Sequence, residues 1–155
     1  FGNRLQEKIL PLLPRPGSSA GNPVDVANPF VAPDAIRGIL THSGSDPRVD
    51  VLILVQLLYH YKSILAMMGT SSLMDIVPVE EFARAAAAAA ADSGKPVVAV
   101  LPNYKRERES MDIEEVMRAA RACYLAHGIP VFDDLISAMK TIGHVGAYHS
   151  RRAQG

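Results

Sequence analysis

The sequence predicts a single α/β domain built on a mostly parallel sheet. Three short apolar runs, at 51–55, 95–101 and 129–132, are typical of strands inside such a sheet. Segments with helical periodicity separate these runs, and strand–helix–strand units with right-handed crossovers make neighbouring strands parallel. The 155 residues fit one domain of ordinary globular composition, with 48% hydrophobic and 21% charged residues.

The first third of the chain predicts two helices and a short strand. Apolar residues recur at helical spacing over 5–13, and the Pro-rich segment 14–19 ends that helix. Two β-branched residues follow an Asn-Pro turn, which predicts a short strand over 22–26. Pro33 suits the first turn of a helix that we expect to end at Gly44.

The middle of the chain alternates strands and helices. The strand at 51–55 is apolar at every position, which predicts that both of its faces are covered. The helix predicted over 79–93 contains a run of seven alanines that permits close approach to a sheet, and Gly94 supplies its stop. Asp112 and Glu115 have the spacing of a capping box and predict the start of the next helix.

Asp133 is predicted to cap a last helix that runs to about residue 149. At about 100° per residue, four residues of this helix share the face that we expect to be buried: Leu135, Met139, Ile142 and Gly146. His144 then points to solvent. Glycine-flanked histidines carry phosphoryl groups in some enzymes, but a mid-helix surface position lacks the mobile loop and the cations that this role needs, so we assign His144 no such role.

Charge and composition exclude several functional classes. Sixteen Lys and Arg residues balance 16 Asp and Glu residues, and no basic stripe is present, so nucleic acid is not an expected partner. The longest apolar run is far shorter than the ~20 residues that cross a bilayer. The single Cys123 fits a structural thiol in a reducing compartment, so we expect a cytoplasmic protein. The opening residues have no signal-peptide pattern, and the chain is interpreted as a fragment of a larger one.

Ligands of parallel α/β folds bind beyond the carboxyl ends of the strands, so we look for chemistry there. His60 and Lys62 follow the central strand and have the residue types of a general base and an anion-binding group. Asn103 and Lys105 follow the second strand, where a lysine can reach a phosphate. A solvated loop is the simpler interpretation of both segments, because neither has a fixed partner and acidic residues are interleaved among the bases of 105–109.

Several sites are not predicted at all. No glycine-rich turn follows the second strand, which argues against nucleotide binding by this domain alone. No Ser-His-Asp order, nucleophile elbow or metal-ligand spacing is present, so no catalytic residue and no metal ligand is assigned. The apolar, Met-rich insert at 56–77 fits either a docking surface or ordinary core packing, and its role is left open.

Five phrases together resemble one enzyme family, in order as well as in spacing. They are Ile-Leu-Pro-Leu-Leu-Pro at 9–14, Asn-Pro-Val-Asp-Val at 22–26, Asp-Pro-Arg-Val-Asp-Val-Leu-Ile-Leu at 46–54, Lys-Pro-Val-Val-Ala at 95–99 and Gly-Ile-Pro-Val-Phe at 128–132. This set resembles the second flavodoxin-like ligase domain of NDP-forming acyl-CoA synthetases, the relatives of succinyl-CoA synthetase. Asn-Pro-Val-Asp is the most specific phrase, and it makes Asn22 and Asp25 candidate substrate or interface residues.

The resemblance implies a flavodoxin-like three-layer sandwich that lacks its first strand. Enzymes of this family convert acid, CoA and ATP to acyl-CoA, ADP and phosphate through a phosphohistidine. The resemblance places CoA, the nucleotide with its Mg²⁺ and the phosphohistidine on other domains, which are then the expected partners, so the domain at 1–155 acts as scaffold and interface without a cofactor of its own. A homo-oligomer is left open.

The chain departs from the family pattern at three strand ends. Ala27-Asn28-Pro29 replaces a Gly-Asp-Ala-like turn, Pro102-Asn103 replaces a glycine pair, and the insert at 56–77 replaces a short turn. These changes leave open a second interpretation, in which the chain is a non-catalytic interaction or regulatory module with the same fold. In both interpretations the isolated chain is expected to be inactive.

Overall fold

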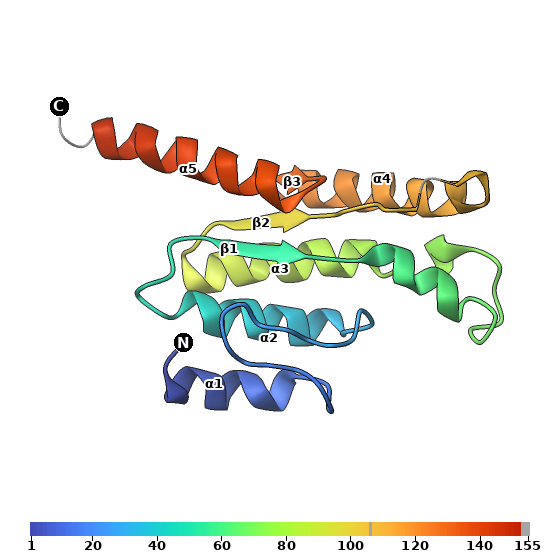
Figure 1. Cartoon of the computed structure of the whole chain (residues 1–155), viewed down its shortest axis with the longest axis horizontal. Helices are drawn as coiled ribbons and strands as arrows, with labels where there is room; N and C mark the ends of the chain where they lie inside the picture. Colours follow the sequence, from blue (N-terminus) through green and yellow to red (C-terminus); the bar gives the residue numbers. More distant parts are fainter. Residues whose placement is uncertain (106, 153–155) are drawn as a thin grey trace.

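The computed structural model describes residues 1–105 and 107–152 of the chain. A parallel sheet of three strands, in the order β1-β2-β3, forms its centre (Figure 1). The strands are β1 (Leu52–Val55), β2 (Val97–Val100) and β3 (Val131–Phe132). The α/β class and the parallel sheet are therefore confirmed.

Four helices pack on one side of the molecule, and one helix packs on the other face of the sheet. The first group is α1 (Asn3–Ile9), α2 (Pro33–Gly44), α3 (Val79–Ser93) and α4 (Met111–Ala126). In Figure 1 α3 lies behind β1, whereas α1 and α2 extend past the free edge of β1. Short 3₁₀ helices join these elements: η1 (Leu10–Leu12), η2 (Leu58–Ile64), η3 (Leu73–Asp75) and η4 (Arg108–Ser110).

The main core lies between the sheet and α2, α3 and α4. Phe82 and Tyr124 are among its largest fully buried side chains, and Ala83, Ala86 and Ala89 are completely buried on α3. The helices approach so closely that a Cβ on Gly44 of α2 would lie 2.6 Å from the Cβ of Ser93. The alanine run of α3 therefore does what the sequence predicts, because small side chains let the helix layers and the sheet come together.

The last helix, α5 (Leu135–Arg152), covers only part of the opposite face of the sheet. Its one buried residue is Ala138, which packs with Val98 and Val100 of β2. The neighbouring residues Ile53 and Val55 of β1 remain 36% and 47% exposed on this side. The prediction that both faces of 51–55 are covered holds at Val51, which packs against Val98, Val100 and Ala138. It is wrong at Ile53 and Val55, because α5 lies against β2 and β3 and leaves these two side chains partly exposed.

The predicted strand at 22–26 is also wrong. Asp25 forms only an isolated antiparallel bridge with Ser19, and the segment does not join the sheet. Val24 and Val26 instead pack beside Ile39 of α2, in a small second core. Burial of these β-branched side chains against a helix satisfies the same apolar pattern that would otherwise mark a strand.

At the starts of α4 and α5, the residue at the cap position differs by one or two positions from the predicted one. Helix α4 begins at Met111 after Ser110, without a side-chain cap, so the capping box at Asp112 and Glu115 is wrong. At the start of α5 the cap is Asp134 and not Asp133, since Asp134 accepts a hydrogen bond of 2.8 Å from the backbone N–H of Ser137. In each case the predicted acid has another partner: Asp112 binds Lys62, and Asp133 binds Arg121.

The predicted buried face of α5 is right at Ile142 and wrong at Leu135, Met139 and Gly146. Leu135 and Met139 are 44% and 58% exposed, and the line that meets the sheet consists of Ala138 and the partly buried Ile142. His144 is exposed, as predicted. Ala138 forms the contact because its small side chain lets the helix axis lie close to β2.

Within the described residues, no helix has both the length and the apolar composition required to cross a membrane.

Candidate functional site

Two neighbouring cavities open at the carboxyl ends of the strands. The first has a volume of about 570 Å³ and lies between the start of α4 and the turn after β3; the second has about 730 Å³ and lies beside η2. Tyr104, Lys105, Glu107 and Ser110 line both cavities. This edge is where parallel α/β folds bind ligands, so it is the candidate site.

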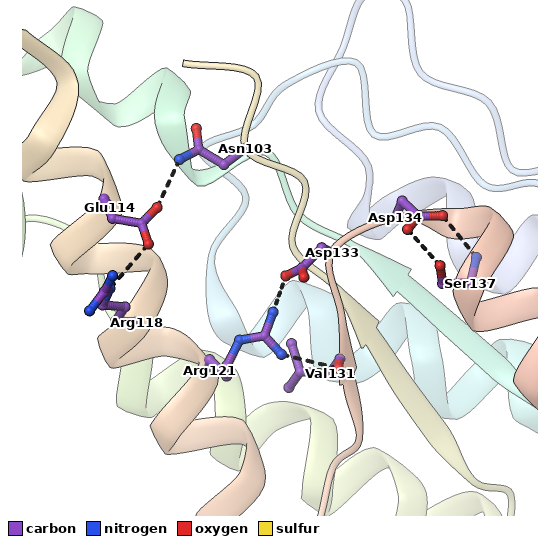
Figure 2. Close-up of polar contacts among 8 residues, drawn as sticks. All are labelled: Asn103, Glu114, Arg118, Arg121, Val131, Asp133, Asp134 and Ser137. Atoms are coloured by element: carbon purple, nitrogen blue, oxygen red, sulfur yellow. Dashed lines mark hydrogen bonds and ion pairs between the residues drawn. The ribbon is translucent and has the colours of Figure 1, made fainter. Parts of the chain in front are cut away.

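Four charged groups of the first cavity are paired with one another, Glu114 with Arg118 and Arg121 with Asp133 (Figure 2). Glu114 accepts hydrogen bonds from the guanidinium of Arg118, at 3.1 Å, and from the side-chain amide of Asn103, at 3.3 Å. Arg121 binds the carboxylate of Asp133 and donates to the carbonyl oxygen of Val131, at 3.2 Å. These contacts tie α4 to the turns after β2 and β3, and they neutralise the two carboxylates and two guanidinium groups that take part.

Lys62 is held in the same way at the second cavity. Its ammonium lies 2.7 Å from the Asp112 carboxylate and also donates to the backbone carbonyl of Glu109. His60 is exposed, and its ring contacts that of Tyr59 at a centroid distance of 4.4 Å. A lysine that spans from η2 to the start of α4 fixes the insert against α4, and Lys62 therefore has a structural role whatever else it binds.

Asn103 organises the turn after β2. Its side-chain oxygen accepts a hydrogen bond of 3.0 Å from the backbone N–H of Lys105, while its amide donates to Glu114. The Lys105 side chain is exposed and lines both cavities. Arg106, in the predicted anion-binding segment 105–109, lies outside the described residues.

The structure brings four of the six sequence-predicted candidates to one edge of the sheet and leaves two elsewhere. His60, Lys62 and Lys105 line the second cavity, and Asn103 lines the first beside Lys105. Asn22 and Asp25 line neither cavity. The Asp25 carboxylate accepts a hydrogen bond of 2.8 Å from the backbone N–H of Ala27, which has a positive φ of 51°, so it stabilises a tight turn.

Two further polar contacts, outside the two cavities, join distant elements and were not predicted from sequence. The buried hydroxyl of Tyr124 donates to the side-chain oxygen of Gln56, and burial raises the pKa of Tyr124. His127 lies 2.9 Å from the Glu80 carboxylate, and this hydrogen bond lowers the pKa of Glu80. Each pair joins residues 47 or more positions apart in the chain, so no local pattern signals it.

Cys123 is half-buried beside Glu80 rather than fully buried. Burial, and then the hydrogen bond with the Glu80 carboxylate, raises the pKa of the thiol. A raised pKa disfavours the thiolate, which is the reactive form, and agrees with the structural role predicted for Cys123.

Comparison with known proteins finds no matching family model, no similar curated protein and no similar solved structure. Among the described residues, no group of three His, Cys, Asp or Glu side chains is placed to hold a metal ion. The site can therefore be characterised only from its own geometry. Its charged side chains connect the ends of strands and helices, an arrangement that suits the positioning of a surface for a ligand or partner.

The carboxylates of this site predict a loss of stability in acid. Arg118, followed by Asn103, lowers the pKa of Glu114 below its ordinary value of 4.5, and the backbone N–H of Ser137 lowers that of Asp134 below 3.8. A group whose pKa is lower in the folded state stabilises the fold above the unfolded pKa, and this contribution is lost as the pH falls through the folded value. We expect the free energy of unfolding, measured in urea from pH 7 to pH 3, to fall below about pH 4.5.

A matched pair of variants checks this acid dependence. Glu114→Gln should make the fall below pH 4.5 less steep, whereas Glu115→Gln, at an exposed position of the same helix, should leave the curve unchanged. Equal curves for the two variants would show that the Glu114 contacts do not contribute to stability.

Proposed function

We propose that the chain is a flavodoxin-like domain of an NDP-forming acyl-CoA synthetase and serves there as scaffold and interface. In this proposal the phosphohistidine, CoA, and ATP with its Mg²⁺ are held by other domains of the cytoplasmic enzyme. The resemblance of five phrases, in order, supports the family, and the three parallel strands with helices on both faces are compatible with a flavodoxin-like sandwich that lacks its first strand.

The pairing of charges at the carboxyl edge carries the scaffold role. Glu114, Arg121 and Lys62 each bind groups from other elements of this same chain. A catalytic acid or base requires a group that is poised to exchange a proton with a substrate, and satisfied ion pairs supply rigidity instead. The exposed His60 and Lys105 are then contact residues for a neighbouring domain or for a substrate held between domains.

A non-catalytic interaction or regulatory module is the second candidate, and one observation favours it. Large apolar side chains are exposed on α5 and β1, including Ile136 at 67% and Met139 at 58%. Apolar surface of this kind marks sites of protein association. The two candidates differ in what accompanies the domain: a synthetase requires a phosphohistidine loop and an ATP-grasp domain in the same protein or in a partner subunit.

An assay of the purified chain, first alone and then in its native complex or full-length gene product, tests the proposal. Alone, with ADP, Mg²⁺, phosphate and a panel of acyl-CoA thioesters, it should form no ATP, and radiolabelled ATP should not label it. In the complex, ATP formation should appear. Lys105→Ala should raise the KM for a substrate, whereas His144→Ala should leave both kcat and KM unchanged. Turnover by the chain alone would contradict the scaffold role, and a complex without ligase activity would favour the regulatory module.

A further inference from the structure

We infer that the uncovered face formed by β1 and α5 is a docking surface for an amphipathic helix of a partner protein, and that this helix carries carboxylates. The inference goes beyond the proposed function, because it holds whether the partner belongs to a ligase or to a regulatory complex. We call this surface the open face and define it by Ile53 and Val55 of β1 and by Leu135, Ile136 and Met139 of α5.

The strand side of the open face is apolar and lacks the cover that parallel strands normally have. Ile53 and Val55 lie beside Val98 and Val100 in the register of the sheet. Val98 and Val100 are buried under α5, whereas Ile53 and Val55 are 36% and 47% exposed. Figure 1 shows α3 behind β1 and no helix in front of it. Parallel sheets occur with helices on both faces, so this face has room for a further helix beside α5.

The helix side of the open face faces the same space. Residues advance about 100° around a helix, so Leu135 and Met139 lie roughly 60° and 100° around α5 from the buried Ala138. Because α5 is right-handed and runs antiparallel to the strands, on the face opposite α3, this rotation turns both residues towards β1. The exposed residues of α5 and β1 therefore flank one another across a single continuous surface.

The residues of α5 beyond the sheet leave space for a partner. Residues 143–150 are all exposed, and the helix contains two glycines, Gly143 and Gly146, whose added Cβ atoms would meet nothing within 4 Å. Each interior glycine costs a helix about 1 kcal/mol relative to alanine, and a helical stretch as short as 143–152 is marginal in water without tertiary contacts. Both glycines lie on the β1 side of the helix, where the missing Cβ allows a second helix to approach closely.

Charge selects an acidic partner over a second copy of this chain. Helix α5 contains no Asp or Glu, and it carries three Lys and Arg side chains: Lys140, Arg151 and Arg152. At about 100° per residue, Lys140 lies about 40° beyond Ile136 on the outer side of α5, so its long side chain borders the open face, whereas Arg151 lies further round, on the side away from β1. A symmetric contact between two copies would bring two cationic α5 helices together, whereas carboxylates on a partner helix complement them.

Binding of designed peptides tests this surface directly. The probe is a fluorescein-labelled helical peptide of about 18 residues, long enough to span the open face, with leucines at i, i+3, i+4 and i+7 and glutamates on one flank. We expect its fluorescence anisotropy to report saturable binding that weakens about tenfold when the glutamates become glutamines, and that weakens as salt is raised.

Matched variants locate the site of binding. Met139→Ser and Lys140→Glu should each weaken binding at least fivefold. Two controls make the same chemical changes elsewhere and should not: Met67→Ser in the insert, where the side chain is 79% exposed, and Lys8→Glu on α1. Unfolding in urea should confirm that all four variants remain folded, since each changed side chain is exposed.

Three results would overturn the inference. They are no binding of the acidic peptide, equal binding of the glutamine peptide, and equal weakening by the test and control variants. Sedimentation of the chain without peptide tests the alternative occupant, a second copy of this chain. A dimer that Met139→Ser dissociates would show that a second copy covers the open face.

Discussion

Replacing Tyr124 with alanine is expected to lower the free energy of unfolding by about 3–5 kcal/mol, as for other buried aromatic side chains. Tyr124 is completely buried on α4, in the cluster that joins the sheet to α3 and α4. Its removal leaves a cavity that the closely packed helices cannot refill, because their contacts depend on small residues that are already in van der Waals contact. Equilibrium unfolding in urea measures the loss.

Tyr124→Phe separates the hydrogen bond from the packing. The variant keeps the ring but leaves the buried side-chain oxygen of Gln56 without the Tyr124 hydroxyl, which we expect to cost about 1–3 kcal/mol. In the double variant Tyr124→Phe with Gln56→Leu, the combined loss should be smaller than the sum of the two single losses. Additive losses would show that the two groups do not interact.

The exposed Tyr104→Ala serves as the control for this prediction. Tyr104 is 72% exposed, and its replacement should change the free energy of unfolding by no more than about 0.5 kcal/mol. If Tyr124→Ala cost as little as the control, the Tyr124 side chain would not contribute to the main core.

The elements that the sequence predicted correctly are those with a strong local pattern. The helices at Pro33–Gly44 and Val79–Ser93 were expected with these bounds, because proline and glycine mark their ends. Gly94, with its φ of 65°, adopts the left-handed conformation that the expected helix stop requires. The apolar runs also predicted the strands, since a continuous apolar run of this length is typical of a buried strand in a small domain.

The errors arose where distant residues compete for one group. The acids expected to cap helices are used elsewhere: Asp112 binds Lys62 from 50 positions away, and Asp133 binds Arg121. The valines of 22–26 are buried against α2 instead of joining the sheet. Periodicity indicates that a side chain prefers burial, but not which surface buries it. The coverage of β1 was mispredicted for the same reason.

The candidate site was predicted in part. Four candidates follow strands in the sequence and were correctly expected at one edge of the sheet, because the carboxyl ends of parallel strands meet there: His60, Lys62, Asn103 and Lys105. Sequence could not show that Lys62 and Asn103 are engaged with Asp112 and Glu114, since Asp112 lies 50 positions from Lys62 and the loop before α4 decides whether Asn103 meets Glu114. The assignment of a function to these residues stays a prediction.

Replacing Ala138 with glutamate is expected to release α5 from the sheet and to cost about 2–4 kcal/mol. Ala138 is completely buried against Val98 and Val100, and only Ile142 adds a further contact from α5 to this cluster. A carboxylate at this position must either be buried without a partner or move the helix away, and burial of an unpaired charge is the more costly of the two. The helix therefore detaches, which limits the loss to the free energy that its contacts supply.

Hydrogen exchange distinguishes detachment from global unfolding. In Ala138→Glu the amides of α5 should lose protection while those of α3 keep it, because α3 packs on the opposite face of the sheet with its own core. Thr141→Glu, an exposed position on the side of α5 away from β1, should change neither stability nor protection. Retained protection of α5 in Ala138→Glu would mean that other contacts hold the helix. Since the open face exists only while α5 is docked, Ala138→Glu should also abolish binding of the acidic peptide, and Thr141→Glu should preserve it.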